Sequence, residues 1–182
     1  GYRLEQGEAP IKETLAAALI HLSLWPRRRG EGLYDPFCGS GTFVIEAARY
    51  AKGIAAGSLR NFRFESWKDN NSSLRKDYLN VPTPDVSIGP ILGSDIDPAA
   101  LELAARNAER AGVADDIRFF QADITQDSFY AIPEMDEETP MLIIGNPPYG
   151  ERLEDEIKPI HQALNKQLFD HLGLLPKRRL TI

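Results

Sequence analysis

The chain has 182 residues, 42% of them hydrophobic, which predicts a single α/β domain with a sizeable core. Its one cysteine excludes an internal disulfide and a cysteine-rich metal site, and the three histidines show no metal-ligand spacing. A formal net charge of −6 argues against this segment alone gripping a nucleic-acid backbone, because such binding depends on lysine and arginine.

Neither a membrane span nor a secretion signal is visible along the chain. No apolar run is long enough to cross a bilayer, and the N-terminus lacks the basic and apolar regions of a signal peptide. We therefore expect a soluble, cytoplasmic protein that holds no metal. The chain opens at Gly1 without a methionine and stops at Ile182 inside an apolar run, so we interpret both ends as cuts and the chain as a fragment, truncated at its C-terminus.

Helical and extended patterns alternate along the chain. The predicted helices are residues 11–22, 42–52, 98–111 and 157–172. The predicted strands are residues 32–34, 91–94, 117–121 and 141–144. Strands that alternate with helices of this length predict an α/β, doubly wound and mostly parallel sheet with right-handed crossovers, covered by helices on both faces.

Residues 58–90 interrupt this alternation. They are rich in asparagine, serine, proline and charge, with a short predicted helix near residues 73–79, and we interpret them as an insertion within one domain spanning residues 1–182. Phe62, Phe64 and Trp67 alternate with polar residues there. We expect them to form a small satellite core, the alternative being that they line the substrate cleft.

Polar motifs follow the four predicted strands at their carboxyl ends. They are Asp35 with its glycine turn, Asp95 with Asp97, Asp123, and the tetrapeptide Asn146-Pro147-Pro148-Tyr149. In an open parallel sheet, ligands bind beyond these ends, near the point where the strand order reverses. The four motifs are therefore expected to converge on one rim.

The charge of this rim predicts the ligand. Gly39 and Gly41 permit a tight turn and a close backbone approach at the head of the following helix, a pattern shared by several nucleotide-binding loops. Asp35 beside that turn would repel a pyrophosphate, and the lysine of a phosphate-cradling loop is absent from it. S-adenosylmethionine (SAM) carries a sulfonium and an ammonium, so an acidic rim favours SAM as the cofactor.

The aspartates that follow the second and third predicted strands have different predicted roles. Asp95 is placed to accept hydrogen bonds from ribose hydroxyls. Asp97 precedes Pro98 and is as well suited to cap the next helix as to bind a ligand. Asp123 is predicted to accept from the adenine amine while apolar neighbours such as Ile124 sandwich the ring, and its alternative is an ordinary turn aspartate.

The tetrapeptide from Asn146 to Tyr149 carries the substrate prediction. Adjacent prolines fix the backbone after a buried strand. The Asn146 side-chain oxygen and the Pro147 carbonyl can then accept from a substrate NH₂, while the Tyr149 ring stacks on a flat base. Because the sulfonium is already an activated leaving group, catalysis needs placement and charge complementarity more than a strong base. Cys38 lies in the glycine turn, away from this loop, and is predicted to be non-catalytic.

These motifs resemble class I methyltransferases of the amino type, and among them the bacterial 23S ribosomal RNA guanine-N2 methyltransferases of the RlmL and YpsC kind. The resemblance covers nearly the whole chain, and its residues are Gly1 to Arg3, Ala9 to Ala18, Asp35 to Gly41, Ser94 to Asp97, and Asn146 to Leu153. It implies a Rossmann-like fold, 23S rRNA as the substrate partner, and an upstream RNA-binding THUMP domain that this chain lacks. It also implies that Lys12, Glu13 and Thr14 border the methionine end of the cofactor.

The residues themselves and the family resemblance together give three sets of candidate site residues. The cofactor set is Lys12, Glu13, Thr14, Asp35, Phe37, Gly39, Gly41, Thr42, Asp95, Ile96, Asp123, Ile124 and Asn146. The catalytic set is Asn146, Pro147 and Tyr149, and the substrate-binding set is Pro148, Tyr149 and Arg152. Alternative functions stay open: a DNA adenine-N6 or protein glutamine-N5 methyltransferase, since the loop suits any planar amine or amide, or a non-catalytic module that binds SAM or RNA.

Overall fold

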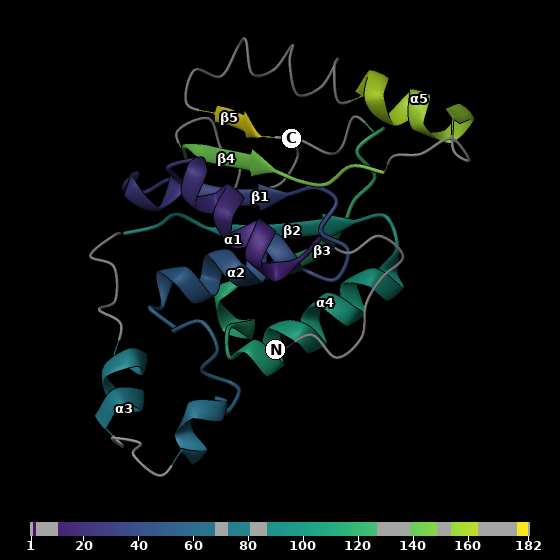
Figure 1. The fold of residues 1–182 in the computed structure, drawn as a ribbon. Coiled ribbons are helices and arrows are strands. Elements are labelled where there is room, and N and C mark those ends of the chain that lie inside the picture. The colour runs from purple at the N-terminus through teal and green to yellow at the C-terminus, as the bar shows by residue number, and fades with distance from the viewer. Residues whose placement is uncertain are drawn as a thin grey trace.

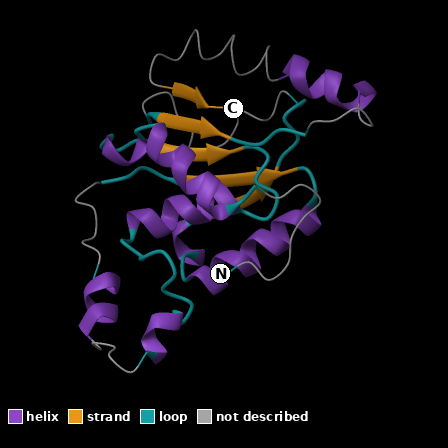
Figure 2. Ribbon diagram, in the orientation of Figure 1, coloured by secondary structure: helices purple, strands orange, loops and turns teal. Residues whose placement is uncertain are grey.

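The computed structural model describes residues 2, 11–67, 73–80, 87–126, 139–148, 154–163 and 178–181. Its centre is a five-stranded sheet in the order β3-β2-β1-β4-β5, in which every neighbouring pair is parallel (Figures 1 and 2). The strands are β1 (Gly32–Asp35), β2 (Ile91–Asp95), β3 (Arg118–Gln121), β4 (Met141–Ile144) and β5 (Arg178–Thr181). The predicted parallel α/β fold is confirmed. β5 was not predicted from the sequence.

Five α-helices accompany the sheet in the described residues. They are α1 (Glu13–Leu22), α2 (Thr42–Ala51), α3 (Ser73–Leu79), α4 (Pro98–Ala111) and α5 (Glu154–Ala163). The first four agree with the predicted helices to within two residues. α5 begins three residues before the predicted start, and residues 164–172 of that prediction lie outside the described part of the chain.

The side chains of the strands alternate between two cores because successive residues of a strand point to opposite faces. On one face, Leu33 of β1 is in register with Leu142 of β4 and packs in a core with residues of α1, α2 and α4. On the other face, Tyr34 is in register with Ile143, and Ile160 of α5 packs against that core. Helices therefore contact both faces, as a doubly wound sheet requires.

The strand order reverses between β1 and β4. The chain proceeds outward from β1 through β2 to β3, then returns to the opposite side of β1 for β4 and β5. This reversal places the ends of β1 and β4 side by side, with α2 and α5 starting on the same side of the sheet as those ends (Figure 1). A ligand site is expected at this point.

The segment between α2 and β2 forms a satellite of the main fold. Phe62 and Phe64 stack at a centroid distance of 5.8 Å, and Arg75 of α3 forms an ion pair with Glu65, which also accepts a hydrogen bond from the Phe62 N–H. This segment lies away from the carboxyl ends of the strands (Figure 1). Phe62 and Phe64 are half-buried against each other, whereas Trp67 is 68% exposed, so the predicted satellite core forms only in part. None of the three residues lines the cleft described below, which disfavours the alternative role.

The described residues form no helix that is long and apolar enough to span a bilayer. Nor do their histidine, cysteine, aspartate and glutamate side chains include three that group closely enough to hold a metal ion.

Candidate cofactor and substrate site

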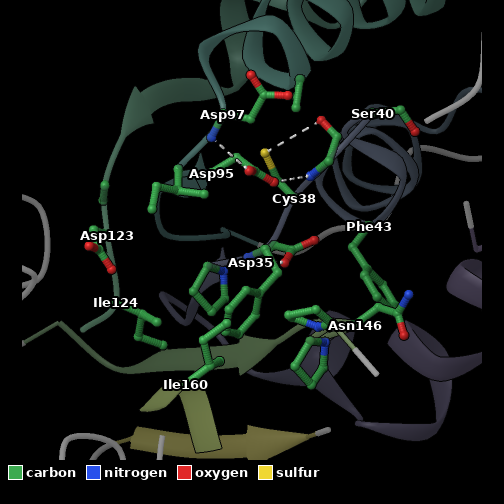
Figure 3. A pocket seen from close by; sticks show the side chains of 18 of the residues that line it. Asp35, Cys38, Ser40, Phe43, Asp95, Asp97, Asp123, Ile124, Asn146 and Ile160 are labelled. Atoms are coloured by element: carbon green, nitrogen blue, oxygen red, sulfur yellow. Dashed lines mark hydrogen bonds between the residues drawn. The ribbon is translucent and has the colours of Figure 1, made fainter. Parts of the chain in front are cut away.

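A cleft of about 940 Å³ opens at the carboxyl ends of β1 to β4, where the strand order reverses (Figure 3). The ends of four strands and the first turns of α2 and α4 contribute to its walls. The predicted site residues that line it are Asp35, Phe37, Gly39, Thr42, Asp95, Ile96, Asp123, Ile124, Asn146, Pro147 and Pro148. Residues from motifs more than 100 positions apart in the sequence therefore share one cleft.

Other predicted residues lie elsewhere. Glu13 and Thr14 line a second pocket, of about 590 Å³, between α1 and α2, and Lys12 borders neither pocket. Near the start of α1, Ile11 is the residue that reaches the main cleft. The predicted substrate residues Tyr149 and Arg152 lie outside the described residues.

Gly41 also does not line the cleft, and its structural reason differs from the predicted one. Its φ of +83° favours glycine, and a Cβ there would stand 3.1 Å from the Cβ of Ala104 in α4. Gly41 therefore permits close packing of the turn on α4, whereas Gly39, with φ of +51°, faces the cleft.

Asp35 is the last residue of β1 and is almost fully buried, at 1% exposure. Its Oδ1 accepts a 3.0 Å hydrogen bond from the Phe37 N–H. Burial raises the pKa of this carboxyl from its ordinary 3.8 to about 8; the Phe37 hydrogen bond lowers it, and the charge of Asp95 raises it further. A cation bound in the cleft would favour the ionised form and lower this pKa.

Asp35 should make stability depend on pH in a defined window. Because the folded-state pKa lies above the unfolded value, the unfolded state ionises first as the pH rises, and the free energy of unfolding falls between about pH 4 and pH 8. The Asp35 contribution is at most about 1.4 kcal/mol per pH unit in that window. Denaturant unfolding of wild type and Asp35→Asn from pH 5 to pH 9 should show a steeper decline for wild type. Equal slopes in both proteins would contradict the buried neutral carboxyl.

Asp95 joins the glycine turn to the end of β2. Its Oδ2 accepts a 2.9 Å hydrogen bond from the Gly39 N–H, and its Oδ1 accepts one of 3.1 Å from the Asp97 N–H (Figure 3). Both carboxylate oxygens therefore bind backbone donors. The sequence predicted a ligand contact for Asp95 and did not indicate this bridge, which spans 56 residues.

The other two aspartates of the rim each serve a local turn. Asp97 caps α4, since its Oδ1 accepts from the Ala99 N–H at 2.9 Å, so the predicted cap is confirmed, while a ligand contact for Asp97 stays a prediction. Asp123 accepts from the Thr125 N–H at 2.9 Å and from the Gln126 side chain. Burial acts to raise the pKa of Asp123, but the hydrogen bonds from Thr125 and Gln126 outweigh it and lower the pKa below its ordinary value. Both aspartates also line the cleft.

The loop after β4 lies directly against Asp35. A Cβ added to Gly145 would stand 3.1 Å from the Asp35 Oδ1 and 3.4 Å from the Phe37 ring. The missing side chain lets the backbone that leads into Asn146 approach the buried carboxyl. Sequence reasoning missed Gly145; its only signal was a glycine between a buried strand and the proline pair.

Two helices supply further walls that the sequence did not reveal. Ala99, Ala100 and Leu103 reach the cleft from α4, and Pro159 reaches it from α5. Ile160 of α5 also lines it (Figure 3). Helical periodicity indicates that such residues share a face, but it does not indicate which cavity that face borders.

Cys38 is buried in the glycine turn and also lines the cleft. Burial, followed by the charges of Asp35 and Asp95, raises the pKa of its thiol well above the ordinary value. A protonated thiol is a poor nucleophile, which agrees with the predicted non-catalytic role.

Comparison with curated proteins identifies similar sequences. Ribosomal RNA large subunit methyltransferase K/L of Alcanivorax borkumensis is 40% identical over 179 residues, which cover 92% of this chain and 24% of that protein. Putative RNA methyltransferase YpsC of Bacillus subtilis is 42% identical over 181 residues, which cover 94% of this chain and 43% of that protein. The chain thus spans less than half the length of these relatives.

Solved structures show the same fold at comparable identity. A Listeria monocytogenes protein described as a predicted N6-adenine-specific DNA methylase has a TM-score of 0.76 and 37% identity. A putative methyltransferase complexed with S-adenosylhomocysteine (SAH), the demethylated product of SAM, has a TM-score of 0.76 and 33% identity. Each comparison covers 99% of this chain and 45% of the other chain.

A family model described as the RMKL-like methyltransferase domain matches residues 1–178, almost the entire chain. With the parallel sheet, the acidic cleft at its reversal point and the rigid loop beside Asp35, this match shows that the chain belongs to the RMKL-like methyltransferase domain family.

Proposed function

We propose that this domain transfers a methyl group from SAM to an exocyclic amine of a base in RNA, with guanine N2 of 23S rRNA as the target. The observation that carries the proposal is the close approach of the Gly145 backbone to Asp35, where an added Cβ would stand 3.1 Å from the carboxyl Oδ1. The Asn146-Pro147-Pro148 loop therefore lies beside Asp35, and both line the same acidic cleft. A cationic methyl donor bound near Asp35 and a planar amine bound at the loop would then be neighbours in that cleft.

The cleft has an appropriate group for each part of SAM. The buried Asp35 carboxyl suits the cationic methionine end, because an ammonium or sulfonium nearby stabilises its ionised form. Asp95, with both oxygens oriented by backbone N–H groups, has further lone pairs for the ribose hydroxyls. Ile96 and Ile124 offer apolar surface for the adenine, with Asp123 beside them to accept from its amine.

The loop after β4 is assigned to the substrate. SAM supplies an already activated methyl group, so the protein must hold the accepting nitrogen in line with it. The Asn146 side-chain oxygen and the Pro147 carbonyl are proposed to accept hydrogen bonds from the substrate NH₂, which orients the nitrogen lone pair toward the cleft. Pro147 and Pro148 fix the backbone of this loop. Tyr149 and Arg152 are proposed to contact the base and a phosphate.

The names of the relatives favour RNA. Two curated relatives at about 40% identity are described as an rRNA and a putative RNA methyltransferase. The Listeria structure is described as a DNA adenine methylase, so that activity is the second candidate. The net charge of −6 supports a division of labour in which other parts of the protein bind the RNA backbone.

A methyl-transfer assay with the intact protein tests the proposal. Labelled SAM is supplied with 23S rRNA from a strain lacking the gene, with DNA, and with a release factor, and the modified nucleosides or residues are identified by mass spectrometry. We expect N2-methylguanosine in the rRNA. N6-methyladenine in the DNA or methylglutamine in the release factor would support the alternative enzymes. Binding of SAH without transfer to any substrate would support a non-catalytic module.

A further inference from the structure

Asn107 lies in α4 and is fully buried. Its Nδ2 donates a 3.1 Å hydrogen bond to the carbonyl oxygen of Ser40, which lies 67 residues earlier in the glycine turn between β1 and α2. Its Oδ1 has no hydrogen-bond partner among the residues that the structure describes. Within that part of the molecule, the polar contact of this side chain is therefore with the glycine turn.

The surroundings of Asn107 do not explain why the residue is polar. Its buried neighbours along α4 are Ala104, Ala108 and Ala111. A buried polar atom without a hydrogen bond lowers stability, and an apolar side chain of similar shape avoids that cost. Packing of α4 would thus be served at least as well by leucine. The hydrogen bond to Ser40 is the feature that an apolar residue would not reproduce.

The glycine turn, residues 38–41, needs such a contact to fix its conformation, because glycine restricts the backbone less than other residues do. Gly39 and Gly41 both have positive φ, at +51° and +83°, and glycine loses more conformational entropy than other residues when it is fixed. The peptide group between Ser40 and Gly41 is held at both ends. Its N–H donates to the Cys38 carbonyl at 2.7 Å, and its C=O accepts from Asn107.

We propose that Asn107 is a positioning residue for cofactor binding, which fixes the glycine turn from behind through the Ser40 carbonyl. Ser40 lines the cleft, whereas Asn107 does not. A change at Asn107 therefore reaches the cofactor only through the turn. This inference rests on the proposed function in one respect, the binding of SAM and SAH in the cleft, and is independent of which substrate is methylated.

The test is SAH binding by the intact protein carrying Asn107→Leu. Calorimetry should show a Kd for SAH that is raised about tenfold or more, as expected from losing one buried hydrogen bond that orders the binding turn. Denaturant unfolding without ligand should give a midpoint close to wild type, because removal of the unpartnered buried Oδ1 offsets the hydrogen bond lost at the Ser40 carbonyl. Asn107→Ala removes the same amide with less steric demand, and is measured alongside in case leucine prevents folding.

Tyr34→Phe is the matched control. The Tyr34 hydroxyl forms a 2.8 Å hydrogen bond with the Ser94 hydroxyl, and both residues are fully buried near the same strand ends. Neither residue lines the cleft. Removing this hydroxyl should lower the unfolding midpoint while leaving the Kd for SAH unchanged, the reverse of the pattern expected for Asn107→Leu.

The outcomes separate the two proposals. Failure of the wild-type protein to bind SAH would overturn the cofactor assignment and this inference with it. Normal wild-type binding, with an unchanged Kd in both Asn107 variants, would overturn only the inference. An equal loss of SAH affinity in Tyr34→Phe would also overturn it, since any lost buried hydrogen bond would then have the same effect.

Discussion

Replacing Asn146 with alanine in the intact protein is expected to lower kcat for methyl transfer by about 10²-fold or more, with SAH affinity nearly unchanged. Asn146 belongs to the predicted cofactor set and lines the cleft, but its side-chain oxygen is proposed to contact the substrate amine and not the cofactor, so its loss acts mainly in the transition state. The fold of the cleft is not expected to depend on it, because the loop approaches Asp35 at Gly145. Pro147 and Pro148 also restrict the loop backbone whichever residue stands at position 146. Steady-state kinetics with rRNA and calorimetry with SAH measure the two effects separately.

Tyr149 supplies the comparison for this prediction. If its ring stacks on the target base, Tyr149→Phe should retain most activity, while Tyr149→Ala should lose much of it, because stacking needs the ring and not the hydroxyl. Equal damage by both variants would mean that the hydroxyl takes part in the chemistry. Near-normal turnover in Asn146→Ala would mean that the loop does not orient the accepting nitrogen.

Asp95→Ala should weaken SAH binding by at least about tenfold and also destabilise the protein. A ribose contact through a charged acceptor is worth roughly 1.5–3 kcal/mol. The bridge from Asp95 to the Gly39 and Asp97 N–H groups adds a second cost, because the variant leaves two backbone donors without their acceptors. Calorimetry with SAH and denaturant unfolding without ligand record the two losses.

Asp97→Ala separates these contributions. It removes the cap on α4, where Asp97 accepts from the Ala99 N–H, and should cost about 0.5–2 kcal/mol of stability. Since Asp97 is assigned to the helix cap and not to the ribose, SAH affinity should change little. If Asp97→Ala loses as much SAH affinity as Asp95→Ala, the two aspartates act together in binding. If a folded Asp95→Ala protein binds SAH with unchanged affinity, Asp95 does not belong to the cofactor site.

The sequence by itself determined most of the helices and strands, and the edge of the sheet at which the site residues gather. Apolar runs such as residues 141–144, and the helical spacing of residues 98–111, are local patterns, so β4 and α4 were predicted with the bounds that the structure shows. The position of Asp35, Asp95 and Asn146 at the carboxyl ends of β1, β2 and β4 also sufficed to bring them to one cleft, because all strands of a parallel sheet end on the same side.

Other features depended on contacts between segments far apart in the chain. β5 was missed, since its four residues gain their strand conformation by pairing with β4. The Asp95 bridge to Gly39 and the packing of Gly41 on Ala104 each join residues more than 50 positions apart. The same holds for the hydrogen bond from Asn107 to Ser40. Residue type and spacing carry information about neighbours along the chain. These contacts are instead set by how β2 and α4 lie against the glycine turn and how β5 pairs with β4, so only the tertiary structure decided them.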